Sequence, residues 1–202
     1  MSRRLPLLLA LTLVSGLAIG AAGALVVAPR SATAADPGIT DRAALEALLA
    51  EPSIAPTGRT RSFELTVQET DWELLPGVVT SAVTFNGTVP GPAIRVTEGD
   101  TVEIRVTNKL SEPTSVHWHG LHVPNDQDGV AGATQDPIEP GATFSYRFVA
   151  PHAGTFMYHA HGPRSREQID RGLSAPFIID PAGGDAVNPD ADVTLAFQGW
   201  MI

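Results

Sequence analysis

From Arg61 onward, apolar and polar residues alternate in a series of short runs. The apolar positions of these runs are Phe63, Leu65 and Val67, then Ile94 and Val96, then Val102, Ile104 and Val106, and then Phe144, Tyr146 and Phe148. A period of two is typical of β-strands that bury one face. Further strands are predicted at 155–159, 175–179 and 193–197, which brings the expected number to about seven to nine.

Turn-forming residues separate these runs. They occur at 86–87 (Asn-Gly), 90–92 (Pro-Gly-Pro), 98–100 (Glu-Gly-Asp), 124–125 (Pro-Asn) and 140–141 (Pro-Gly). Short strands divided by turns at such spacing favour an antiparallel sandwich. The sequence therefore predicts an all-β, Greek-key β-sandwich over residues 61–182.

The first 34 residues have the pattern of an export signal. Arg3 and Arg4 precede residues 5–29, which hold no charged side chain, and residues 32–34 read Ala-Thr-Ala. This order is typical of a cleavable signal peptide, so we expect export to the cell envelope, periplasm or medium. The apolar run also exceeds the roughly 18 residues that span a bilayer, so an uncleaved membrane anchor is the alternative. The Arg3-Arg4 pair further hints at the twin-arginine route.

Two segments flank the predicted sandwich. Residues 35–60 are expected to form a leader with a short helix over residues 41–50, which ends before Pro52. Residues 183–202 begin with Gly183-Gly184 and are expected to be a linker and the start of a truncated next segment. The apolar ending at Met201-Ile202 favours a continuation of the chain beyond this point.

Charge and cysteine content narrow the candidate functions. The chain has 202 residues and a formal net charge of −9, which argues against nucleic acid as a partner. It contains no cysteine, so it has neither a disulfide framework nor a thiolate ligand for a metal.

Four of the six histidines form two His-x-His pairs, His117 with His119 and His159 with His161. Chance predicts roughly 0.2 such pairs in a chain of this length and histidine content. Both pairs fall in strand-like segments, where residues i and i+2 point to one face, and Trp118 and Ala160 would then face the core.

Imidazoles without thiolate suit copper or zinc, and less well nickel or non-haem iron, so ligand type alone leaves the metal open. His122 and His152 each stand alone in a loop-like segment. We expect them to be exposed or hydrogen-bonding histidines rather than ligands.

Four segments in order resemble the N-terminal plastocyanin-like domain of multicopper oxidases, the laccase-like enzymes. They are residues 85–92 (Phe-Asn-Gly-Thr-Val-Pro-Gly-Pro) running into 96–108, residues 116–121 (Val-His-Trp-His-Gly-Leu), residues 128–135 (Asp-Gly-Val-Ala-Gly-Ala-Thr-Gln) and residues 154–161 (Gly-Thr-Phe-Met-Tyr-His-Ala-His). The resemblance covers the chain from about Phe63 to Met201. It implies a cupredoxin-like fold and copper as the cofactor.

The resemblance also implies roles for particular residues. His117 and His119 would supply one ligand to a type 2 copper and one to a type 3 pair, and His159 and His161 would supply two type 3 ligands. Asp128 matches an acidic residue thought to help deliver protons during dioxygen reduction, although Asp-Gly is also a common turn pair. Met157 stands where the family often has tryptophan.

The resemblance implies an incomplete enzyme in this chain. The family's type 1 copper needs a cysteine, and the later histidine motifs of the cluster are also missing here. A C-terminal cupredoxin domain or a partner chain would supply that half, and the complete enzyme would use dioxygen and a reducing substrate. The alternatives are a stand-alone exported copper-binding or carrier protein, and a degenerate interaction module that binds no metal.

Overall fold

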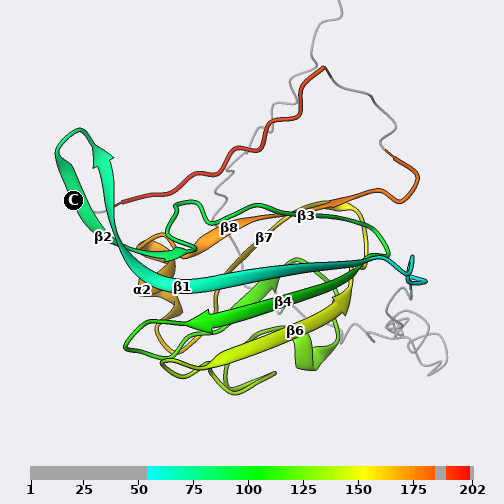
Figure 1. Ribbon diagram of the computed structural model, residues 1–202, viewed down its shortest axis with the longest axis horizontal. Coiled ribbons are helices and arrows are strands. Elements are labelled where there is room, and N and C mark those ends of the chain that lie inside the picture. Colours follow the sequence, from blue (N-terminus) through cyan, green and yellow to red (C-terminus); the bar gives the residue numbers. More distant parts are fainter. Residues whose placement is uncertain (1–53, 185–189, 201–202) are drawn as a thin grey trace, which may run out of the picture. The chain divides into compact units, whose positions relative to one another are not determined.

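A computed structural model describes residues 54–184 and 190–200, which belong to the compact unit Leu49–Ile202. Their strands form two four-stranded sheets, one in the order β2-β1-β4-β6 and the other in the order β3-β8-β7-β5. The bounds are β1 Thr60–Leu75, β2 Val78–Phe85, β3 Ile94–Thr97, β4 Thr101–Asn108, β5 Val116–His119, β6 Thr143–Val149, β7 Gly154–Ala160 and β8 Ser174–Asp180. The all-β sandwich is confirmed (Figure 1).

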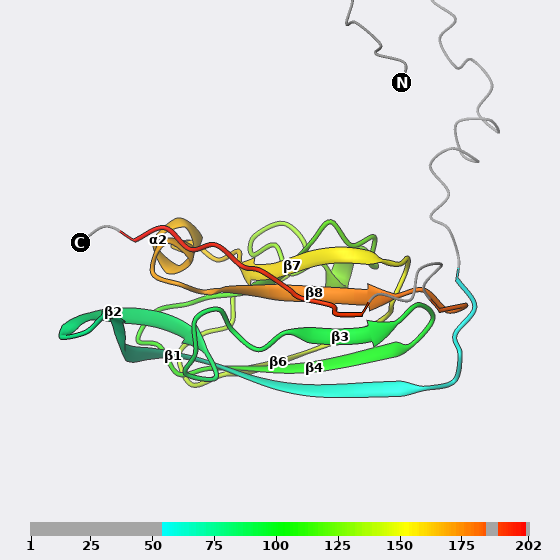
Figure 2. The same ribbon diagram turned by 90° about the horizontal axis from the view of Figure 1, so that it is seen from above.

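The core lies between the two sheets, which face each other as two layers in Figure 2. Alternate residues of each strand fill it, as the apolar period predicts: Val102, Ile104 and Val106 of β4 are fully buried, and so is Phe177 of β8. Trp118 of β5 is also fully buried, and its ring meets that of Tyr146 edge-on at 5.0 Å between centroids. Aromatic contacts thus join β5 to the opposite sheet.

The strands are not all antiparallel, which corrects part of the prediction. β1 pairs with β4 in parallel, and β3 pairs with β8 in parallel. The reason is that the chain crosses between sheets, from β2 in the first to β3 in the second and back to β4 in the first. Parallel neighbours need such a crossover, and local turn signals do not reveal it.

Two short helical segments lie in the connections. The 3-10 helix η1 spans Asn125–Gln127 and follows β5, and the helix α2 spans Ser165–Asp170 and lies between β7 and β8. The sequence did not predict α2, because six residues are too few to show helical periodicity.

The strand predicted at 193–197 is wrong. Residues 191–200 are in no strand, and the side chains of Val193, Leu195 and Phe197 are 72%, 74% and 93% exposed. An apolar alternation makes a strand only where a neighbouring strand takes up its backbone hydrogen bonds, and the described residues offer none here. The predicted signal peptide and the helix at 41–50 lie outside the described residues.

Candidate metal centre

The two His-x-His pairs lie on adjacent strands of the same sheet. β5 and β7 pair antiparallel with His117 opposite His159 and His119 opposite Met157. The residues between them, Trp118 and Tyr158, point the other way and are fully buried. The period of two therefore sends the histidines to the outer face of the sheet, while their neighbours anchor both strands in the core.

Three histidines bring ligand atoms together. One nitrogen each from His117, His119 and His159 lies within 4.8 Å of the others. His119 Nδ1 lies 3.1 Å from His159 Nε2. Two nitrogens bound to one ion at about 2.0 Å stand about 2.8 Å apart at a right angle and about 3.3 Å apart at a tetrahedral angle. These two rings are therefore placed to share one metal ion.

Backbone carbonyls fix the tautomers of two of these rings. His117 Nδ1 lies 2.8 Å from the carbonyl oxygen of Asp128, and His159 Nδ1 lies 2.8 Å from that of Ala160. A carbonyl oxygen only accepts hydrogen bonds, so each Nδ1 carries the proton and each Nε2 keeps its lone pair. This is the usual outer hydrogen bond of a metal-binding histidine.

Burial lowers the pKa of His159, and the neighbouring histidines His117, His119 and His161 lower it further, while its hydrogen bond to Ala160 opposes the shift. The neutral ring is the form that binds a metal, so this environment favours the ligand state near neutral pH.

His161 follows the end of β7 and is held differently. Its backbone N–H donates to the carbonyl of Ser115 at 3.0 Å, and its ring centroid lies 5.4 Å from that of His117 and 6.2 Å from that of His159. Its ring nitrogens do not belong to the group from His117, His119 and His159 whose members lie within 4.8 Å of one another. The structure thus brings all four predicted rings to one place, with the His161 ring somewhat closer to that of His117 than to that of His159.

Asp128 lies next to this group, as part of the loop that follows η1. Its Oδ1 is 3.4 Å from His117 Nδ1, and its side chain is 26% exposed. Gly129 makes the approach possible: its φ is +81°, and a Cβ there would stand 1.7 Å from the carbonyl oxygen of Val116. Only glycine fits where this loop crosses β5. The Asp128-Gly129 segment therefore both forms a turn and contacts His117.

The same loop is tied to both histidine strands. Trp118 Nε1 donates to the carbonyl of Gln127 at 2.9 Å, and the Ala131 N–H donates to the carbonyl of His161 at 3.2 Å. The loop from Gln127 to Ala131 thus positions Asp128 relative to both His-x-His pairs.

The sequence missed one histidine contact. His122 and His152, which it treated as isolated, have ring centroids 5.2 Å apart. They are 30 positions apart in the chain, in two loops, so no local pattern relates them.

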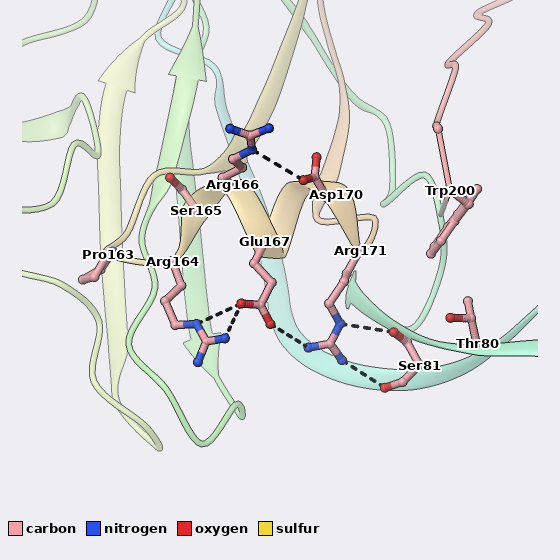
Figure 3. A pocket seen from close by; sticks show the side chains of 11 residues that line it. Thr80, Ser81, Pro163, Arg164, Ser165, Arg166, Glu167, Asp170, Arg171 and Trp200 are labelled. Carbon is pink, nitrogen blue, oxygen red and sulfur yellow. Dashed lines mark hydrogen bonds and ion pairs between the residues drawn. The ribbon is translucent and has the colours of Figure 1, made fainter. Parts of the chain in front are cut away.

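A cleft of about 640 Å³ lies beside α2 and contains none of the histidines. Figure 3 shows its charged groups paired with one another: Arg164 with Glu167, Arg166 with Asp170, and Arg171 with Glu167 and Ser81. The charged groups of this cleft are thus engaged with one another, and the candidate metal ligands lie on the histidine face instead.

The donor set fits copper. Imidazole nitrogens with fixed tautomers, two of them at the spacing of a shared ion, are ligands that copper accepts readily. Comparison with known proteins decides the family: the profile described as multicopper oxidase matches residues 66–183. The chain belongs to the multicopper oxidase family. This confirms the predicted family, the cupredoxin-like fold and copper as its cofactor.

Individual multicopper oxidases show the same similarity. The chain is 40% identical over 154 residues to multicopper oxidase MmcO of Mycobacterium tuberculosis, covering 75% of this chain and 29% of that protein. It is 44% identical over 138 residues to a copper resistance protein A homolog of Pseudomonas syringae pv. tomato, covering 68% of this chain and 23% of that protein. The chain therefore spans about a quarter of the length of these relatives.

Solved multicopper oxidases share the fold. The structure of the enzyme from Pseudomonas thermotolerans matches with a TM-score of 0.59 at 42% identity, over 60% of this chain and 30% of that one. The blue copper oxidase from Nitrosomonas europaea matches with a TM-score of 0.57 at 39% identity, over 65% of this chain and 40% of that one. Within residues 54–184 and 190–200, no helix has the length and apolar character needed to cross a membrane.

Proposed function

We propose that this chain supplies half of the histidine ligands of a trinuclear copper cluster, at which the complete multicopper oxidase reduces dioxygen to water. The observation that carries the proposal is the 3.1 Å contact between His119 Nδ1 and His159 Nε2, with a nitrogen of His117 within 4.8 Å. A copper carrier with one site does not need four histidines on one sheet face. Similarity to oxidases across most of the domain also favours the oxidase over the carrier.

The geometry supports a division of the ligands. His119 and His159 share one type 3 ion, because their nitrogens are at the spacing for one metal. His117 serves the type 2 ion through Nε2, because the Asp128 carbonyl holds its Nδ1 proton. His161, whose ring centroid lies 5.4 Å from that of His117, would serve the second type 3 ion.

Copper bound here would supply the electrons and the binding positions for dioxygen, and the chain's own residues would hold the ions and handle protons. Asp128 is the proposed proton-handling residue. Its carboxylate is partly exposed and lies 3.4 Å from His117 Nδ1, so it links solvent to the histidine face.

Further parts of the enzyme lie outside this chain. It has no cysteine and therefore no cysteine-ligated type 1 copper. We propose that a C-terminal cupredoxin domain, in the same polypeptide or on a partner chain, supplies that centre and the other cluster ligands. The reducing substrate, a phenol, a metal ion or a similar reductant, would be bound there. The sequence pattern of residues 1–34 supports export of the protein.

The first test is a copper titration of the chain with a competing chelator. We expect His119→Gln combined with His159→Gln to weaken the tightest copper site by about 100-fold or more, because removing even an outer partner of a ligand weakens metal binding by about 10- to 100-fold. His122→Gln is the matched control and should leave the tightest site intact. Unchanged affinity in the folded double variant would overturn the proposal.

The second test uses the copper-loaded chain alone. We expect no intense blue absorption, because no thiolate is present, and negligible oxidase turnover, because four-electron reduction needs the full cluster and an electron entry site. Intense thiolate-to-copper absorption is not expected at any copper loading, and its appearance would contradict this assignment of ligands.

A further inference from the structure

His122 and His152 form a pair outside the histidine cluster. His122 is exposed and lies in the loop after β5, and His152 is half-buried in the turn between β6 and β7. Their ring centroids are 5.2 Å apart, and their planes meet at 60°. The fold thus brings together two imidazoles that belong to neither His-x-His pair. They are also not part of the group formed by His117, His119 and His159.

The spacing of the two rings fits a shared metal ion. With a metal–nitrogen bond of about 2.0 Å, the centre of each ring stands about 3.2 Å from the ion. Two such rings have centres about 4.5 Å apart at a right angle and about 5.2 Å apart at a tetrahedral angle. The observed 5.2 Å lies at the upper end of this range, so a small rotation of the exposed His122 ring would reach the right-angle arrangement that Cu²⁺ favours.

The pair is held in place by its neighbours. Phe156 meets the His152 ring edge-on, with centroids 5.0 Å apart and planes at 88°. The Gly120 backbone has a φ of +87°, and a Cβ there would stand 3.1 Å from Phe156 Cδ1. Gly120 therefore lets the chain turn closely over Phe156 toward His122, while the same phenyl ring fixes His152.

The pair lies away from the outer face that carries the cluster. Phe156 packs against the core, whereas its neighbour Met157 is 39% exposed and lies opposite His119 in the pairing of β5 and β7. Successive residues of a strand point to opposite faces, so Phe156 and the ring packed on it belong to the other side of β7. A metal ion at His122 and His152 would thus occupy a separate site.

We propose that His122 and His152 form an accessory surface site for a divalent metal ion, with Cu²⁺ as the preferred ion and water as the remaining ligands. Imidazole pairs bind Cu²⁺ more tightly than other divalent first-row ions. The acidic chain, with a formal net charge of −9, attracts cations to its surface. Two protein ligands make this site weaker than the three-histidine group. The proposal shares no residue with the proposed cluster and stands independently of it.

The test compares Cu²⁺ binding by the complete chain and two double variants, using calorimetry and the nitrogen hyperfine pattern in electron paramagnetic resonance. His122→Gln with His152→Gln should lose one weaker equivalent of Cu²⁺ and keep the tightest site. His119→Gln with His159→Gln should show the reverse, so failure of either assignment is visible by itself. Equal stoichiometry and affinity in the complete chain and the first variant would overturn the accessory site.

A second measurement avoids dependence on the double variant. His122→Gln alone removes an exposed side chain and should weaken, by about 10-fold or more, the Cu²⁺ equivalent that the first double variant loses. Asp126→Asn, in the same loop, is the control for loss of local charge and should retain it. In the complete chain, Zn²⁺ should shift the imidazole resonances of His122 and His152 together. Independent or absent shifts would count against a shared ion.

Discussion

Two aspartates in similar glycine-containing turns have opposite surroundings. Asp100, at the turn between β3 and β4, is fully buried and accepts three hydrogen bonds: from the Thr97 N–H at 3.0 Å, from Arg59 Nε at 2.8 Å and from Thr57 Oγ1 at 3.1 Å. Asp128 is partly exposed, and its carboxylate oxygen lies 3.4 Å from His117 Nδ1.

The difference separates a structural aspartate from the one proposed to handle protons. The Asp100 carboxylate accepts hydrogen bonds from Thr57, Arg59 and Thr97. These bonds join residues 57–59 to the turn between β3 and β4. At Asp128 the backbone carbonyl makes the short contact with His117, which leaves the carboxylate available. A fully satisfied buried carboxylate stabilises a fold, and a partly solvated one beside a metal ligand is suited to proton transfer.

Displacing the loop that carries Asp128 is expected to have the largest effect on stability. We expect Gly129→Ala to lower the free energy of unfolding by about 3 kcal/mol or more, because its Cβ would stand 1.7 Å from the Val116 carbonyl oxygen. The control is Gly132→Ala, which has the same φ of +81° but no atom within 4 Å. That variant should lose only about 1 to 2 kcal/mol from backbone strain. Equal losses in urea denaturation would show that the loop does not need its close approach to β5.

The structural role of Asp100 gives the next largest effect. We expect Asp100→Asn to lower the free energy of unfolding by about 2 kcal/mol, because the amide nitrogen cannot accept the hydrogen bonds that a carboxylate accepts. Thermal unfolding at neutral pH measures the loss. Asp126→Asn, at an exposed position of η1, is the matched control and should change stability little.

Acid should test the structural role of Asp100 as well. Burial acts to raise the pKa of Asp100, but the hydrogen bonds from Thr97, Arg59 and Thr57 and the charge of Arg59 outweigh it, so the pKa lies below its ordinary value. A depressed pKa adds stability at neutral pH that is lost as the pH falls from the ordinary value of about 3.9 through the folded one. Asp100→Asn should therefore flatten the decline of stability between about pH 5 and pH 2. An unchanged acid profile would contradict the role given to Asp100.

The link between the two sheets gives a smaller effect. Tyr146 of β6 accepts a hydrogen bond from the Val116 N–H of β5 at 3.2 Å, so Tyr146→Phe should lower the free energy of unfolding by about 1 kcal/mol. Burial raises the pKa of Tyr146 to about 12 and also raises that of Tyr158. The folded chain should therefore show little tyrosinate absorbance at pH 10, where a free phenol is about half ionised.

The smallest effect on stability is expected at Asp128. Asp128→Asn keeps the backbone carbonyl that orients His117, so unfolding free energy should change by less than about 1 kcal/mol and copper affinity by less than about 10-fold. In the complete oxidase, the same variant should slow dioxygen reduction and alter its pH profile. A large loss of stability would place Asp128 with Asp100 as a structural residue.

The sequence predicted the strands of the sandwich well where they bury one face. In β4 and β6 the residues that follow the period of two turn their side chains to the core, fully or partly buried. It failed at α2, which is too short for a helical period, and at residues 193–197, where the alternation has no neighbouring strand. Strand patterning describes side chains, whereas strand formation also needs a partner for the backbone.

The placement of the four histidines together could be predicted because the pattern that produces it is local. A His-x-His pair in a strand places both rings on one face whatever the rest of the fold does, and the resemblance to a known family assigned their roles. The contact of His117 with Asp128 is less local, since it depends on a glycine with a left-handed backbone at the crossing of a loop and a strand.

The sequence by itself thus determined the β-sandwich, the family and the two histidine pairs, because each depends on residues that lie close together along the chain. Only the tertiary structure decided that His119 meets His159, that Asp100 and Asp128 have different partners, and that His122 meets His152. The long-range contacts among these join residues 30 to 43 positions apart, and the contact of Asp128 with His117 depends on a loop crossing a strand. Local periodicity carries no information about which loops meet once the two sheets have packed.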